Sequence, residues 1–245
     1  MTDHAKPKHA FEQYEWLARM DPGFDAARRR LAGEVWQPGK PVLEVKYREI
    51  VAATVLAYRT YPSVESHLRS AVEAGATLRE ILEGLQAGAT LGGFTVLHFT
   101  IPYLIALNEE FGDGIIDGPG AAKRTRSPKP STGPVSRGMR EWAWLDKVDP
   151  DYDGARRDIT AWVWTPANPA LPVKVREMCA CAILAYRAFP TLDGHFRRAV
   201  REGASVMELL EAMEVAALPG GFPLLHYALP FLMKLQEEIE AGTFA

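Results

Sequence analysis

Cysteine is scarce in this sequence, and neither sign of charge is in large excess. The 245 residues include two cysteines, Cys179 and Cys181, and carry a formal net charge of −3. So few cysteines exclude a disulfide-stabilised scaffold, and we expect a reducing, cytoplasmic environment. The absence of a basic excess argues against binding to nucleic acid or to an anionic membrane surface.

The sequence also lacks a long apolar run without breaks. Residues 84–108 and 215–233 carry no charged side chain, and either run is long enough to cross a bilayer. However, a Gly-Gly pair and at least one proline interrupt each run. We therefore expect buried core helices joined at a Gly-Gly corner, not membrane spans. The start, MTDHAKPKHAFEQ, contains no apolar segment of the signal-peptide type.

The chain contains an internal repeat with an offset of 128 residues. Trp16 returns as Trp144 and Trp36 as Trp164, and the segment REIVAATVLAYRTYPSVESHLRSAVEAGA returns as REMCACAILAYRAFPTLDGHFRRAVREGA. About 40 of roughly 100 aligned pairs are identical, whereas unrelated sequences would give roughly six. The sequence therefore predicts a tandem duplication of one domain.

A linker separates the two copies. The segment DGIIDGPGAAKRTRSPKPSTGPVSRG is rich in glycine, proline, serine and basic residues, and it has few bulky apolar side chains. Such a composition is typical of a flexible connection, and we interpret its basic run as a solvated tether. We expect the first repeat to span residues 1–112, the linker 113–138 and the second repeat 139–245.

Helical spacing of apolar residues is common in both copies, and strand-like alternation is rare. Thr77 with Glu80 and Ser205 with Glu208 have the spacing of a capping box, which marks a helix start. Six helices in so short a copy have more apolar surface than one copy can bury, so we expect an all-α pseudo-dimer that also associates with further chains. The helices expected in the first copy cover residues 11–20, 25–36, 46–60, 63–74, 77–90 and 94–110.

The segment HLRSAVEAGATLREILEGLQAGATLGGF, together with Arg48-Glu49 before it, resembles the signature of the carboxymuconolactone decarboxylase family. The second copy carries the same features in the same order, with Arg176-Glu177. The resemblance covers roughly 200 residues. It implies the all-helical fold shared with the alkylhydroperoxidase AhpD, and it implies homo-oligomers, often rings of six domains. Three tandem chains would rebuild such a ring as a homotrimer, and the alternative is a monomer in which the two copies pack as a pseudo-dimer.

The family has a redox branch, which this sequence does not match. That branch carries Cys-x-x-Cys followed by three residues and a histidine, and it reduces peroxides through thiolate chemistry. The corresponding positions before His67 and His195 hold Thr60, Ser63, Ala188 and Thr191. Without two thiols within reach there is no disulfide cycle, so we expect the other branch, which does acid–base chemistry without a cofactor.

The catalytic candidates are His67, His195, Glu49 and Glu177. Imidazole titrates near neutral pH, which suits a general acid or base, although a histidine here can also simply pack or cap a helix. The resemblance places a catalytic histidine at this position and, in AhpD-like members, a glutamate that acts with it. The alternative for each glutamate is a salt bridge to the nearby arginine or lysine.

Six further residues are candidates for substrate binding. Arg59 and Arg187 suit a carboxylate, or they stabilise a helix C-terminus by their charge. A histidine, His98 or His226, follows each Gly-Gly corner and would reach a pocket or sit satisfied in the core. Each tyrosine, Tyr58 or Tyr186, would donate to an enolate oxygen or merely pack. A metal could be held by His67, His98 and Glu49, but no close-spaced ligand pair is present, so we expect none.

These features favour a cofactor-free enzyme of the decarboxylase or lyase type. Its substrate would be a small carboxylated, lactone-like or cyclic oxo compound. The alternative, from another class, is a non-catalytic scaffold or small-molecule binding protein, because residues beside the two histidines differ between the copies. A thiol peroxidase is a third hypothesis.

Overall fold

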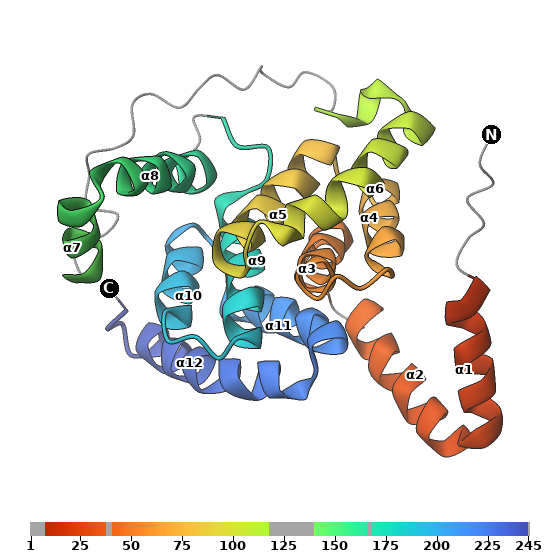
Figure 1. Cartoon of the computed structure of the whole chain (residues 1–245). Helices are drawn as coiled ribbons and strands as arrows, with labels where there is room; N and C mark the ends of the chain where they lie inside the picture. Colours follow the sequence, from red (N-terminus) through yellow and green to blue (C-terminus); the bar gives the residue numbers. More distant parts are fainter. Residues whose placement is uncertain (1–7, 38–40, 118–139, 166–167, 245) are drawn as a thin grey trace. The chain divides into compact units, whose positions relative to one another are not determined.

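The computed structural model of the chain is built from helices (Figure 1). It describes residues 8–37, 41–117, 140–165 and 168–244, and within these ranges it contains twelve α-helices, one 3-10 helix and no strand. Two compact units, Met1–Val42 and Leu43–Ala245, are distinguished by their internal contacts and are described separately. Most of the expected linker, residues 118–138, lies outside the described residues, and the expected domain boundaries stay a prediction.

The unit Met1–Val42 contains two helices that contact each other, α1 (Lys8–Met20) and α2 (Pro22–Trp36). Asp21 caps α2, because its side chain accepts a 2.9 Å hydrogen bond from the backbone N–H of Phe24. Pro22 follows at the first helical position, where a missing N–H costs nothing. Both expected helices are therefore present, each starting about three residues earlier than the pattern indicated.

The unit Leu43–Ala245 contains the remaining elements of both repeats. The sequence predicted the helices of the first repeat to within about three residues. The described elements are α3 (Val45–Tyr58), α4 (Val64–Glu73), α5 (Leu78–Gly92), α6 (Thr95–Phe111), the 3-10 helix η1 (Asp113–Ile115), α7 (Arg140–Val148), α8 (Pro150–Trp164), α9 (Val173–Tyr186), α10 (Leu192–Arg201), α11 (Val206–Gly220) and α12 (Phe222–Glu240).

Local sequence signals fix the starts of α5 and α11. The Thr77 hydroxyl accepts from the backbone N–H of Glu80, and the Glu80 carboxylate accepts from the backbone N–H of Thr77. Ser205 and Glu208 repeat both contacts. Two otherwise unpaired backbone donors are thus satisfied at each helix start, which confirms both predicted capping boxes.

The Gly-Gly corner joins α5 to α6 and α11 to α12. Gly93 has φ +107° and Gly221 has φ +91°, backbone conformations that residues with a side chain rarely adopt. Each helix therefore ends at this pair, and the next begins within two residues. Among the described residues no helix is long and apolar enough to cross a membrane.

The core of this unit lies around α3 and α9, which contact each other. Helix α5 contacts both α3 of its own repeat and α9 of the other, and α11 contacts α9 and α3 in the same way. A Cβ on Gly84 of α5 would lie 2.5 Å from Ile50 Cγ2 and 3.3 Å from Cys179 Sγ. The absence of a side chain at this position lets α5 approach both repeats closely, so the two repeats share one core.

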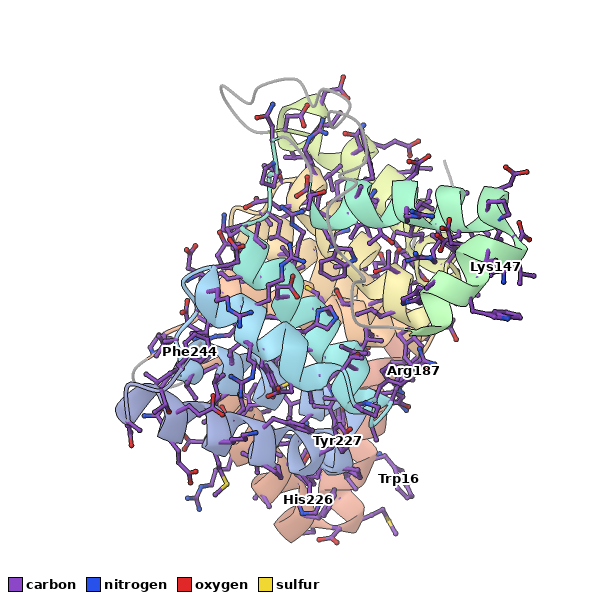
Figure 2. The ribbon with its side chains drawn as sticks, turned by 90° about the vertical axis from the view of Figure 1, so that its left-hand side faces the viewer. Trp16, Lys147, Arg187, His226, Tyr227 and Phe244 are labelled. Carbon is purple, nitrogen blue, oxygen red and sulfur yellow. The ribbon has the colours of Figure 1, made fainter. Side chains whose placement is uncertain are left out.

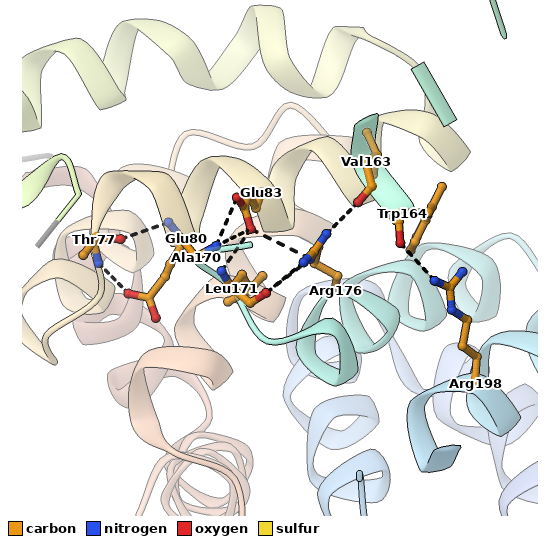
Figure 3. A network of polar contacts seen from close by, with 9 residues as sticks. All are labelled: Thr77, Glu80, Glu83, Val163, Trp164, Ala170, Leu171, Arg176 and Arg198. Atoms are coloured by element: carbon orange, nitrogen blue, oxygen red, sulfur yellow. Dashed lines mark hydrogen bonds and ion pairs between the residues drawn. The ribbon is translucent and has the colours of Figure 1, made fainter. Parts of the chain in front are cut away.

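Reciprocal buried ion pairs join the repeats. Glu83 of α5 accepts a 2.9 Å hydrogen bond from the backbone N–H of Leu171 and lies 3.8 Å from Nε of Arg176 (Figure 3). The side chains of Glu83 and Arg176 are each 1% exposed. Arg176 also donates to the backbone carbonyls of Val163 and Leu171. The buried charges are therefore compensated, as burial requires.

The equivalent glutamate of the second repeat makes the corresponding contact with the first repeat. Glu211 accepts a 2.8 Å hydrogen bond from the backbone N–H of Leu43 and a 3.1 Å one from Arg48 Nη2. Because each repeat gives the other the same pair, the contact has the two-fold character of a homodimer interface inside one chain. The predicted pseudo-dimer is confirmed.

Candidate acid–base site

In the first repeat the structure brings together a glutamate and a histidine that lie 18 residues apart. Glu49 is on the second turn of α3, and His67 is on the first turn of α4, the helix packed against it. The Oε2 atom of Glu49 lies 2.6 Å from Nδ1 of His67. The Glu49 side chain is 11% exposed and the His67 side chain 24%. The pair is therefore shielded on the glutamate side and reachable on the histidine side.

The second repeat forms the same pair from α9 and α10. Glu177 Oε2 lies 2.6 Å from His195 Nδ1. Glu177 is fully buried, whereas the His195 side chain is 22% exposed. In each repeat the neighbouring basic residues contact other glutamates. Lys46 contacts Glu80 and Arg48 contacts Glu211, while Lys174 contacts Glu208 and Arg176 lies 3.8 Å from Glu83. The salt bridges considered as the alternative role are thus made with other partners.

The contact with the glutamate fixes the orientation and the tautomer of the imidazole ring. A carboxylate against Nδ1 favours the tautomer in which that nitrogen carries the proton, so the lone pair lies on Nε2. The same carboxylate stabilises the imidazolium when Nε2 takes up a second proton. A partly exposed histidine held in this way can act as a general base and then as a general acid.

An arginine lies beside the second pair, and sequence reasoning missed it. Nε of Arg198 on α10 lies 3.1 Å from Oε1 of Glu177, and its Nη2 donates a 3.0 Å hydrogen bond to the Trp164 carbonyl (Figure 3). The Trp164 ring lies 5.4 Å from the His195 ring, centroid to centroid. The alignment of the two repeats places Ser70 at the position of Arg198, and this difference was the sequence signal that could have pointed to the arginine.

A second arginine on the same helix has a structural role. Arg197 donates two hydrogen bonds to the Glu238 carboxylate of α12, at 2.7 and 2.8 Å, and a third to Asp193 at 2.9 Å. Arg69 and Glu110 make the corresponding bidentate contact in the first repeat. These contacts tie the histidine-bearing helices to the last helix of each repeat.

The predicted arginines lie away from the Glu–His pairs. Arg59 donates to the backbone carbonyl of Pro219, near the end of α11. Arg187 donates to the carbonyl of Leu91, near the end of α5. Arg59 follows Glu49 by ten residues, which is roughly 15 Å along the helix. Each guanidinium therefore lies where it offsets the negative end of a helix in the other repeat.

The remaining substrate-binding candidates are not brought to the pairs either. The rings of Tyr58 and Tyr186 contact each other edge to face, with centroids 5.5 Å apart, between the repeats. His98 and His226 are exposed on α6 and α12, in contrast to the core or pocket position expected from their apolar neighbours (Figure 2). Their exposure arises because α6 and α12 each bury only one face.

Cys179 and Cys181 are fully buried in α9. Burial raises the pKa of the Cys179 thiol to about 12 and also raises that of Cys181. A thiolate is therefore disfavoured at either position. Within the described ranges, no group of three or more histidine, cysteine, aspartate or glutamate side chains has the arrangement of a metal site.

Two surface grooves occupy equivalent corners of the repeats. One, of about 520 Å³, is lined by α5, α6 and Ile116, and the other, of about 580 Å³, by α10, α11, α12 and Phe244. Leu78 and Val206 are matching members of their linings. Neither lining contains a residue of the Glu–His pairs.

The duplicated helical fold with its two Glu–His pairs was compared with known proteins. The family model described as "Carboxymuconolactone decarboxylase family" matches the chain twice, at residues 22–104 and 152–233. The chain belongs to the carboxymuconolactone decarboxylase family. Each match contains one complete Glu–His pair, so the family signature and the candidate site coincide in both repeats.

A solved structure from Burkholderia xenovorans shares the family's fold with this chain over nearly its whole length. That protein is provisionally named a gamma-carboxymuconolactone decarboxylase subunit. The sequences are 26% identical, the match covers 96% of this chain and 92% of the other, and the TM-score is 0.60. No curated protein matches this chain.

Proposed function

We propose that this member of the carboxymuconolactone decarboxylase family is a cofactor-free enzyme of the decarboxylase or lyase type. Its substrate is a small carboxylated, lactone-like or cyclic oxo compound. The observation that carries the proposal is the Glu–His contact of 2.6 Å, formed independently in each repeat. Membership of the family and the name of the B. xenovorans relative support the reaction class.

In this proposal the histidine moves the proton. Its Nε2 removes a proton from the carbon next to a carbonyl group, or returns one to the enolate that remains after carbon dioxide leaves. Glu49 or Glu177 orients the ring and stabilises the imidazolium while it exists. Arg59, Arg187, Tyr58 and Tyr186 are assigned to the contact between repeats, because their described partners lie there.

Removal of both histidines tests the proposal. The wild-type protein, with a chelator present and without added thiol, is incubated with a panel of small lactones and β-oxo acids, and product is followed by mass spectrometry. The double variant His67→Ala/His195→Ala is expected to lose at least about 100-fold in rate, the usual contribution of a general acid or base. Unchanged turnover would show that the mechanism is wrong. His98→Ala/His226→Ala is the matched control.

The second candidate is a small-molecule binding protein without catalysis. It is favoured by the two grooves, which lie in equivalent places but away from the Glu–His pairs. Binding of panel compounds that survives the double histidine variant, with no turnover in the wild type, would support it. A thiol peroxidase is disfavoured by the buried thiols, and these fit our proposal of a reducing, cytoplasmic location.

We further propose that three chains form a homotrimer. Apolar side chains on the outer faces of α6 and α12 remain exposed, with Ile105 at 55%, Phe222 at 63% and Met233 at 61%. Large exposed apolar patches mark protein contacts, and closed symmetry is the usual way to cover exposed apolar side chains. Light scattering decides the matter, because one chain has a mass of 27.1 kDa. A measured mass close to that of one chain would rule out the trimer.

A further inference from the structure

We infer that Arg198 makes the second Glu–His pair a binding site for a small carboxylate, and that the first pair, which has Ser70 in the equivalent place, binds such an anion much more weakly. The inference deepens the proposed function, on which it rests for the chemical role of the pairs, by assigning the carboxylated compound to one of the two sites. It is carried by the geometry around Glu177 and by the charge difference between the sites.

The geometry leaves Arg198 with donors to spare. Its Nε faces the buried Glu177 carboxylate, and one Nη2 proton is used by the Trp164 carbonyl. A guanidinium has five N–H donors, so three are left by these contacts. The Arg198 side chain is 34% exposed and His195 is 22% exposed, so both reach the surface beside Trp164. A carboxylate can accept from the guanidinium and from protonated His195 together.

The charge balance differs between the sites by one unit. In the first repeat, among the residues that the structure describes, Glu49 contacts His67 and no arginine. That pair has a net charge of −1 with a neutral histidine and zero with an imidazolium. In the second repeat Arg198 raises these values to zero and +1. For the same protonation state of the histidine, a carboxylate is therefore bound more favourably by the second site than by the first.

Anchoring of Arg198 adds to this preference. The guanidinium is held against Glu177 and the end of α8 before any ligand arrives, so little side-chain freedom is lost on binding. Arg197, the adjacent arginine, cannot substitute for it, because its donors are occupied by Glu238 and Asp193. The specificity of the second site thus depends on one side chain that the first repeat lacks.

NMR titration of the histidine ring signals tests the inference. The probes are acetate and benzoate, with acetamide and benzamide as uncharged matches. Signals of His67 and His195 are assigned with single His→Gln variants. In the wild type, the carboxylates are expected to shift the His195 signals in a saturable way and to leave the His67 signals nearly unchanged. The amides are expected to shift neither.

Two exchanges between the repeats sharpen the test. Arg198→Ser is expected to weaken carboxylate binding roughly 10- to 100-fold, the cost of losing a charged hydrogen bond. Ser70→Arg is expected to create a saturable response at His67. Arg201→Ser, which removes a positive charge from the same helix at an exposed position, serves as the matched control. Circular dichroism verifies that each variant is folded.

Several outcomes would overturn the inference. Equal carboxylate affinity at both histidines, an absent response at His195, or full binding in Arg198→Ser would each do so, and an unresponsive His67 in a folded Ser70→Arg variant would count against it. These outcomes are distinct from failure of the proposed function. The binding readout needs no turnover, whereas the acid–base mechanism fails if the double histidine variant retains activity or if the wild type turns over no compound.

Discussion

The two Glu–His pairs share a distance but not an environment. Both contacts measure 2.6 Å, yet Glu177 is fully buried and faces Arg198, whereas the Glu49 side chain is 11% exposed and has a serine at the equivalent position. The contacts between the repeats are equivalent in both directions, since Glu83 and Glu211 each contact the other repeat in the same way. Contacts that bind the repeats together were kept in both copies, while a position beside the Glu–His pair diverged.

The comparison also explains why such divergence is tolerated. Arg198 is on the outer part of α10, 34% exposed, and its described contacts are within the second repeat. A serine there removes no contact from the core shared by the repeats. By contrast, Arg48 and Arg176 are 1% exposed and joined to glutamates across the repeats, so a change there leaves a buried charge uncompensated.

The largest difference is expected when each glutamate is removed. Glu177→Ala removes a fully buried carboxylate that contacts His195 and Arg198 and leaves a cavity in its place, so we expect a loss of about 2–5 kcal/mol in unfolding free energy. Glu49→Ala leaves one partly exposed histidine, so we expect about 1–3 kcal/mol. Urea denaturation measures both. Glu73→Ala, at an exposed position on α4, is the control, and equal losses for the two glutamates would contradict the asymmetry.

A smaller difference is expected at the closest approach of α5 to the core. A Cβ on Gly84 would lie 2.5 Å from Ile50, whereas the second repeat already has Ala212 at the equivalent position. Gly84→Ala is therefore expected to cost about 1–3 kcal/mol through overpacking. Ala212→Gly is expected to cost about 1 kcal/mol, the penalty of glycine in a helix. Thermal unfolding compares them, and a stabilised Gly84→Ala variant would show that the two repeats pack alike.

The contact between Arg197 and Glu238, at the end of the second repeat, is expected to make the stability of the folded chain depend on pH. Hydrogen bonds from Arg197 hold the pKa of Glu238 below its ordinary value of 4.5. A carboxyl with a lowered folded-state pKa contributes stability that is complete above the unfolded value and is lost as pH falls through the folded value. Glu238→Gln is therefore expected to lower the melting temperature at pH 6, and this deficit is expected to shrink below about pH 4.5.

The control for this pH series is Glu237→Gln, which changes an exposed neighbour on α12. Its melting temperature is expected to follow that of the wild type across the range. A deficit of Glu238→Gln that stays constant from pH 6 to pH 3 would show that the Arg197 contact does not stabilise the folded state.

Much of the fold was accessible from the sequence because its signals are local. The repeat, the two capping boxes and the Gly-Gly corners can each be recognised from short stretches of sequence, and all appear in the structure. Pairing of Glu49 with His67 was also within reach, since α3 and α4 are adjacent in the chain and the family resemblance linked the two residue types.

The sequence could not show the contacts between the repeats or the exposure of single side chains. Sequence position gave no sign that Arg59 and Arg187 reach across to carbonyls of the other repeat. His98 and His226 follow uncharged stretches, yet they are exposed because an apolar run on a surface helix can leave one face uncovered. Arg198 could not be assigned from the sequence, because no local signal shows that its side chain reaches Glu177 on the neighbouring helix.

The smallest effect is expected when the two cysteines take the residues of the first repeat. Val51 and Ala53 occupy the equivalent positions, so Cys179→Val/Cys181→Ala introduces side chains that already pack well in the matching helix. We expect a change of less than about 1.5 kcal/mol in stability and none in activity, because volume-conserving exchanges are well tolerated. With the Cys179 pKa raised to about 12 by burial, the thiolate fraction at pH 8 is on the order of 10⁻⁴. The native wild type is therefore expected to resist iodoacetamide and the urea-unfolded chain to react at both sites. Rapid modification of the folded protein would show instead that α9 opens to solvent.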